Sequence, residues 1–227
     1  MSWKEFKNHI EGYKNGSFLF RGQNKPYRLR TSFHRTGRAD IYRYINEDIP
    51  ALKRATSSKT KHQFNLQNAE ENGAFFALLQ HHGYPTPLLD WTYSPYVASF
   101  FAFRGNTVSN NVRIYILNGK LLAEKTFQSK ILVPGFLFIT TDEYLAIENE
   151  RITPQQSAFT LTNIDDIETF ISVVETNQAV KILEAVDIPI SEKSLVIKDL
   201  RYMGITAGSM FPGLDGICEE QKERYFG

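Results

Sequence analysis

"LLQHHGYPTPLLDWTYSPYVASFFA", residues 78–102, carries the strongest structural signals in the chain. A helical pattern stops at Gly83, because glycine commonly follows the last turn of a helix. Three prolines lie within residues 84–95 and exclude a helix there. The Ser-Pro pair that ends this segment is a typical N-cap and first turn, so the apolar residues 96–103 are expected to form a buried helix.

Outward from this stretch, apolar residues recur at helical spacing toward both ends of the chain. Ser2 and Glu5 match a capping box, which predicts a first helix in residues 1–16 that ends near Asn15 and Gly16. Further helices are expected at residues 39–53, 64–82, 164–175 and 191–202, with a polar connector at 55–62 and a C-terminal helical element over 191–227. Strands are expected at residues 17–21, 112–117, 158–162 and 179–186.

This order of elements predicts the fold class. Helices and strands are mixed along the chain, and we find no internal repeat, low-complexity tract or linker. We therefore expect one compact α+β domain over residues 1–227, built on a mixed or antiparallel sheet with flanking helices. A chain of 227 residues with 42% hydrophobic content can bury a sizeable core.

Charge and cysteine content narrow the functional classes. The 26 basic and 25 acidic residues nearly cancel, so any site for an anion must be local. The single cysteine, Cys218, excludes an internal disulfide and fits a reducing compartment. The N-terminus lacks the apolar core of a signal peptide, and no run of apolar residues is long enough to span a membrane. We expect a cytoplasmic protein that does not enter a membrane.

Arg21 ends a short apolar strand and is followed by Gly22. An arginine at such a place can hold a carboxylate or phosphate through two N–H groups, and a glycine leaves room for a ligand to approach the backbone. The alternative is that Arg21 pairs with an internal carboxylate such as Asp90 and stabilises the fold.

Polar residues gather in the proline-rich segment. The backbone amides at the start of the helix after Ser94 could bind an anion, with the hydroxyl of Thr92 or Ser94 adding to the site. The alternative is that Asp90 and Ser94 cap the helix while Trp91 fills the core; for Ser94 alone, the capping role is favoured.

His81 and His82 suggest a metal site, but neighbouring side chains on a helix point about 100° apart and cannot share one ion in the usual way. We expect no metal. His81 remains a candidate acid, base or hydrogen-bond donor, or a histidine satisfied within the core. Further along, Arg151 and Gln155 lead into a predicted strand, and the nearby Glu148 and Glu150 are expected at the surface.

Together these stretches resemble the FRG domain, a family of bacteria and phages named for an [FY]-R-G motif. The match covers most of the chain. Phe20-Arg21-Gly22 followed by Gln23 corresponds to the name motif, and "QHHGYPTPLLDWT" from Gln80 to Thr92 to the central signature. Shorter elements are similar too: Ser32 and Arg35 in "RTSFHR", Arg151-Ile152 with Gln155, and Gly204-Ile205 with "FPGLDG". One departure is Pro87, where the family has arginine. If that arginine binds an anion in the family, this protein has lost the contact or replaced it with one from Arg28, Arg30 or Arg35.

A weaker resemblance is to ADP-ribosyltransferases of the Arg-Ser-Glu type. Their first strand ends in Tyr-Arg-Gly, with the arginine on an NAD phosphate, and a later strand carries a catalytic glutamate. Here Ser157, two residues after Gln155, occupies the place of that glutamate. Asp90, Glu148 or Glu150 would have to substitute for it, and of these we favour Asp90.

The first functional hypothesis, implied by these resemblances, is an NAD-using transferase or glycohydrolase acting as a bacterial or phage toxin or defence effector. Trp91 or Tyr27 would stack on a ring of NAD. The candidate catalytic residues are Arg21, His81, Asp90 and Gln155, and the candidate cofactor-binding residues are Arg21, Gly22, Gln23, Arg35, Trp91 and Thr92.

The second hypothesis is a module that binds a nucleotide, a nucleic acid or a phosphorylated partner without catalysis. Its basis is the basic arm of residues 21–43, in which cations alternate with aromatic residues, a composition that suits phosphate contacts and base stacking. The cations are Arg21, Lys25, Arg28, Arg30, Arg35, Arg38 and Arg43. A run of charges is also typical of a solvated surface.

Overall fold

The computed structural model describes residues 1–14, 16–38, 40–105 and 109–226. Their strands form a six-stranded sheet in the order β4-β5-β2-β1-β3-β6, and every neighbouring pair is antiparallel. The strands are β1 (Phe18–Gln23), β2 (Leu88–Thr92), β3 (Asn111–Asn118), β4 (Ile139–Asp142), β5 (Ser157–Thr162) and β6 (Leu183–Pro189). The expected α+β domain is confirmed, and its sheet is antiparallel.

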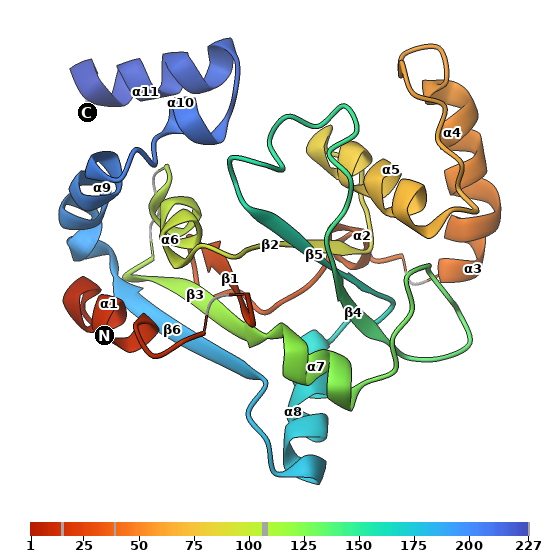
Figure 1. Cartoon of the computed structure of the whole chain (residues 1–227), viewed down its shortest axis with the longest axis horizontal. Helices are drawn as coiled ribbons and strands as arrows, with labels where there is room; N and C mark the ends of the chain where they lie inside the picture. The colour runs from red at the N-terminus through yellow and green to blue at the C-terminus, as the bar shows by residue number, and fades with distance from the viewer. Residues whose placement is uncertain (15, 39, 106–108, 227) are drawn as a thin grey trace.

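Helices flank this sheet on both faces (Figure 1). They are α1 (Trp3–Ile10), α2 (Ser32–Arg35), α3 (Ile41–Arg43), the π-helical turn η1 (Tyr44–Asp48), α4 (Ile49–Thr56), α5 (Ala69–His81), α6 (Pro95–Phe103), α7 (Gly119–Lys125), α8 (Ile167–Gln178), the 3-10 turn η2 (Ile190–Glu192), α9 (Lys193–Tyr202), α10 (Ala207–Met210) and α11 (Leu214–Phe226). No helix of the described residues is both long enough and apolar enough to cross a membrane.

The apolar core is divided by the sheet. On one face, Leu19 and Trp91 pack with α7 and α8. On the other face, Phe20 of β1 packs under α1, α6 and α9, whereas Leu88 of β2 packs with α2 to α5. Figure 1 shows these two groups of helices side by side over different halves of the sheet. Because side chains alternate along a strand, Asp90 shares the face of Leu88, where the two groups meet.

Strand β2 is the largest difference from the sequence-based expectations, which identified residues 84–95 only as non-helical. Pro87 lies just before the strand, where its missing N–H is not needed, and its carbonyl accepts a hydrogen bond from Thr162 N at 3.1 Å. Within the strand, buried Leu89 and Trp91 flank exposed Asp90. Because the strand has only five residues and just its central one is exposed, the pattern alone cannot separate it from a rigid loop.

Several boundaries also differ. The helix expected from residue 64 begins at Ala69, because the Asn68 side chain accepts hydrogen bonds from the first free N–H groups. The strand expected at 179–186 begins at Leu183, since Ala179 adopts a left-handed conformation with φ 51° that ends α8. The helix expected at 39–53 is divided by η1 and continues to Thr56.

Three short elements, α2, α7 and β4, were not predicted from the pattern. Three of the predicted boundaries involve Asn15, Ala39 and Gly227, which lie outside the described residues.

Gly22 determines how closely α6 packs on β1. A Cβ atom at this position would lie 1.8 Å from the Ala98 carbonyl oxygen and 2.8 Å from Ala102 N, both backbone atoms of α6. The glycine therefore serves helix packing, and the space that we expected a ligand to use is filled by α6.

We predict that Gly22→Ala lowers the free energy of unfolding by about 1–3 kcal/mol or more, because the helix backbone must move away from the strand. Urea unfolding followed by circular dichroism measures this. Gly135→Ala is the matched control, since nothing lies within 4 Å of a Cβ at that site; its effect should stay within about 0.5 kcal/mol. Equal effects of the two substitutions would contradict the packing role of Gly22.

Candidate functional site

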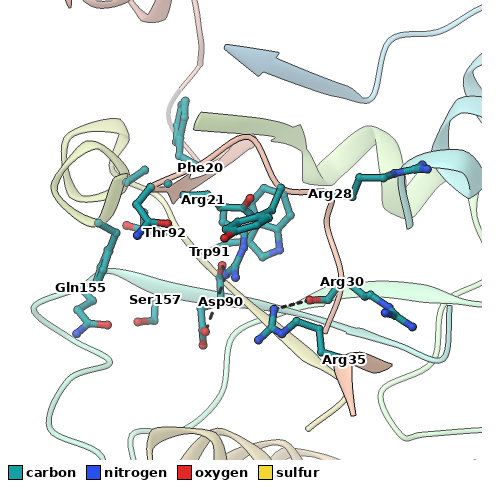
Figure 2. Close-up of a pocket in the computed structure, with 16 residues that line it drawn as sticks. Phe20, Arg21, Arg28, Arg30, Arg35, Asp90, Trp91, Thr92, Gln155 and Ser157 are labelled. Carbon is teal, nitrogen blue, oxygen red and sulfur yellow. Dashed lines mark hydrogen bonds and ion pairs between the residues drawn. The ribbon is translucent and has the colours of Figure 1, made fainter. Parts of the chain in front are cut away.

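A cavity of about 710 Å³ lies between β1 and β2. We call it the β1–β2 cavity; Figure 2 draws its lining. Its volume falls in the range of about 300–1,000 Å³ that is typical of small-molecule sites. The residues that line it are Phe20, Arg21, Gly22, Gln23, Asn24, Tyr27, Arg28, Arg30, Arg35, Asp90, Trp91, Thr92, Ala98, Phe101, Gln155 and Ser157.

The cavity exists because β1 and β2 separate. Their register consists of the single pair Phe20 and Thr92. By contrast, β1 pairs with β3 over its whole length, and β2 does so with β5. Beyond Phe20, the chain of β1 therefore stays with β3 and moves away from β2, and residues 24–35 of the basic arm run along the gap.

Arg21 bridges this gap. Its side chain is 18% exposed, and its Nη1 donates a hydrogen bond to the backbone carbonyl of Asp90 at 2.5 Å. The same Nη1 lies 4.0 Å from Asp90 Oδ2. Burial lowers the pKa of the Arg21 guanidinium, and the Asp90 carboxylate acts in the opposite direction. The contact between Arg21 and Asp90 posed by the second alternative is thus present, and both residues line one cavity.

Two buried polar atoms beside the cavity have no hydrogen-bond partner in the part of the chain that the structure describes. They are Arg21 Nε, a donor, and Gln23 Oε1, an acceptor. Buried polar atoms are nearly always paired, so an unpaired donor and acceptor in one cavity lining indicate a place where a ligand or water completes the structure.

Asp90 is held by a chain of side-chain hydrogen bonds. Its carboxylate is 60% exposed, and its Oδ1 accepts a hydrogen bond from Gln80 Nε2 at 2.6 Å. The Gln80 carbonyl in turn accepts a hydrogen bond from the hydroxyl of Thr86, which is fully buried. A buried residue thereby holds the Gln80 amide, and the amide orients the carboxylate.

The cations of the cavity differ in their partners. Arg28 contacts Asp166 at 2.6 Å and Glu168 at 3.0 Å, and Arg30 forms an ion pair with Asp165. In Figure 2 both guanidinium groups point away from Arg21 and Asp90.

Arg35 has a different environment. Its Nη1 donates to the Arg30 carbonyl at 2.8 Å, and within the described residues it has no carboxylate partner. Its guanidinium lies toward Asp90 in Figure 2. Arg21 and Arg35 therefore provide the positive charge that faces the cavity.

Trp91 and Thr92 line the cavity mainly as structural residues. The indole is 3% exposed, and its Nε1 donates to Thr160 Oγ1 at 3.1 Å, so its ring is not open to stacking. The side chain of Tyr27 is 56% exposed, and Lys25 Nζ lies over its ring at 5.9 Å from the centroid.

The start of α6 is capped by its own side chains. Thr92 Oγ1 accepts from Ser94 N at 3.0 Å, and Ser94 Oγ accepts from Val97 N at 3.2 Å. These side chains satisfy the amides of Ser94 and Val97, and Pro95 has no N–H to offer. The simpler interpretation of Ser94 as an N-cap is confirmed.

A second cavity of about 200 Å³ lies between α5 and α6, here called the α5–α6 cavity. It shares Asp90, Phe101, Gln155 and Ser157 with the β1–β2 cavity. The remaining lining residues are Ala77, Gln80, His81, Asn149, Arg151, Ile152, Phe159 and Phe211.

His81 and Gln155 thus occupy different parts of the site. His81 lines only the α5–α6 cavity, whereas Gln155 lies in the shared wall and its Nε2 donates to the Met210 carbonyl at 2.9 Å. Burial lowers the pKa of His81, as do the charges of Arg151 and His82, while a hydrogen bond with Asn149 raises it. His81 is therefore neutral near pH 7 and able to accept a proton.

The other predictions near this region have simple outcomes. Glu148 Oε1 accepts from His62 N at 2.7 Å, and both Glu148 and Glu150 are exposed outside the two cavities.

The sequence pattern missed Phe101, because an apolar helix gives no sign of which residue faces a cavity.

The comparison with known proteins and protein families found one match, in the first half of the chain. No curated protein and no solved structure matches it. The model of one family does match, over the residues that supply Arg21, Arg35 and Asp90 to the β1–β2 cavity, whereas Gln155 and Ser157 come from beyond it. That model is of the FRG domain, and it matches residues 16–111 of the chain.

Proposed function

We propose that the β1–β2 cavity binds a dinucleotide of the NAD type and that the protein breaks the bond between its ribose and nicotinamide. The observation that carries this proposal is the convergence of Arg21 and Asp90, a cation and a carboxylate from adjacent strands, on one cavity of about 710 Å³. Both an ADP-ribosyltransferase-like enzyme and an NAD glycohydrolase would use such a pair.

The binding step rests on the two cations without strong carboxylate partners. Arg21 and Arg35 suit the charge and geometry of a pyrophosphate. Arg21 Nε and Gln23 Oε1 offer one unpaired donor and one unpaired acceptor, which fits a ligand that carries amide or hydroxyl groups. Tyr27 supplies an exposed ring on which a base can stack.

The chemical step rests on Asp90. A fixed carboxylate stabilises the positive charge that develops on the ribose as its bond to the leaving group lengthens. Ser157, the position of the glutamate in Arg-Ser-Glu transferases, pairs in register with Thr92, two residues from Asp90, and lines the same cavity. Asp90 is therefore suited to provide the charge that Ser157 lacks. In a bacterium or phage, such an activity suits a toxin or a defence effector.

Binding without catalysis is the second candidate, and Ser157 is the observation that favours it. The arm now supports a nucleic-acid surface less well, because Arg28, Arg30, Arg38 and Arg43 already contact carboxylates. A nucleotide held in the cavity by Arg21 and Arg35 remains compatible with this second candidate.

We predict that Asp90→Asn lowers nicotinamide release from NAD by about 10²–10³-fold, because the charge that stabilises the ribose is lost. The amide keeps an acceptor for Gln80, so thermal stabilisation by NAD should remain. Glu150→Gln, a substitution outside both cavities, is the control. If the wild-type protein is stabilised by NAD but releases no nicotinamide, the protein is a binding module.

We predict that adding Ser157→Glu to Asp90→Asn restores turnover by at least about tenfold over the single variant. The new carboxylate enters the same cavity lining, so the charge returns. The assay is again nicotinamide release, with Ser157→Gln in the same background as the uncharged control. Equal rates for the Glu and Gln variants would contradict this.

We predict that Arg35→Gln weakens ADP-ribose binding by roughly 10–100-fold, the effect of losing a hydrogen bond between charged groups. Arg28→Gln is the matched control, since Arg28 lines the same cavity but already contacts two carboxylates; it should change affinity little. Isothermal titration calorimetry measures both, and a greater loss in Arg28→Gln would show that the phosphate binds elsewhere.

A further inference from the structure

The α5–α6 cavity contains a cation that the proposed function does not use. Arg151 lies in its lining, and within the described residues its guanidinium has neither an ion pair nor a hydrogen bond. Its contact is with the ring of Phe211, at 5.0 Å from the ring centroid. A guanidinium held on an aromatic face beside a cavity keeps its N–H groups available to a ligand.

Arg104 provides an internal comparison. Its guanidinium also lies over Phe211, at 4.1 Å, but it contacts Glu219 through two hydrogen bonds of 2.6 Å each. Two arginines thus share one ring, and a carboxylate neutralises only one of them. Arg104 helps to fix Phe211, whereas Arg151 retains its charge at the cavity.

The neighbouring polar groups leave room for an anion. Asp90 lies in the wall shared with the larger cavity and its Oδ1 already accepts from Gln80, while the Gln155 amide donates to Met210. The positive charge of Arg151 lowers the pKa of His81. A negative group bound beside Arg151 would offset that charge and favour protonation of His81. The protonated ring could then donate a second hydrogen bond to the bound group.

We propose that the α5–α6 cavity is an anion-binding subsite in which Arg151 and His81 hold a phosphate or carboxylate group. Its volume of about 200 Å³ is enough for such a group and a few further atoms. The anion belongs either to the ligand of the β1–β2 cavity, reaching past Asp90, or to a separate second ligand. The proposal does not depend on NAD cleavage.

The test is an NMR titration of the histidine ring protons with and without inorganic phosphate, with the His81 signal identified by its absence in His81→Gln. Bound phosphate offsets the charge of Arg151, so we expect the pKa of His81 to rise when phosphate is present. The groups that act on the pKa of His81 are Arg151, His82 and Asn149, and the Asp90 carboxylate lies in the same cavity lining. A His81 titration that phosphate leaves unchanged overturns the proposal.

Variants separate the two arginines. Arg151→Gln should raise the pKa of His81 in the absence of phosphate and weaken phosphate binding at least about tenfold. Arg151→Lys should keep part of the phosphate binding. Arg104→Gln is the matched control and should retain the phosphate effect. Persistence of that effect in Arg151→Gln would place the anion elsewhere.

The two sources of the anion are distinguished by adding ADP-ribose at saturating phosphate. Release of phosphate from His81 would indicate one ligand that spans both cavities, and simultaneous binding would indicate a second ligand. If ADP-ribose does not bind at all, the proposed function loses its support, while the phosphate titration still decides on the subsite.

Discussion

The site depends on one constraint: β1 and β2 are paired at a single position and separate beyond it. After the pair formed by Phe20 and Thr92, the Asp90 carbonyl receives its hydrogen bond from the Arg21 guanidinium. A side chain is longer than a backbone N–H, so the strands can stand apart without leaving that carbonyl unpaired. The cavity, the exposed Asp90 carboxylate and the route of the arm all follow from this arrangement. Gly22 adds to it, because α6 can approach β1 only where no Cβ intervenes.

Charge is distributed locally in this protein. A net charge of +1 implies no general attraction for anions, and most arginines of the arm are held by carboxylates. Arg21, Arg35 and Arg151 are the exceptions around the cavities: Arg21 lies 4.0 Å from Asp90, and the other two have no carboxylate partner within the described residues. Their charges surround one shared wall that carries Asp90 and Ser157. This pattern favours a ligand with negative groups that lies against a single carboxylate.

The sequence allowed much of this site to be predicted before any geometry was known. Arg21, Gly22, Gln23, Arg35, Asp90, Trp91, Thr92 and Gln155 all line the β1–β2 cavity. Their individual roles were less predictable. Gly22 contacts a helix, and Trp91 is enclosed in the core, because sequence patterns do not specify which neighbour fills the space next to a residue. His81 lies in the second cavity for the same reason.

The sequence by itself determined the local elements: the capping box at Ser2, the break after Gly83, the N-cap at Ser94 and the apolar helix that follows. These depend on hydrogen bonds and backbone angles within a few residues, so short patterns specify them. Only the tertiary structure decided that β2 is a central strand, that Arg21 reaches Asp90 across a gap of 69 residues in sequence, and that Ser157 lies beside them. Those contacts depend on strand order and register, which arise from packing between segments far apart in the chain.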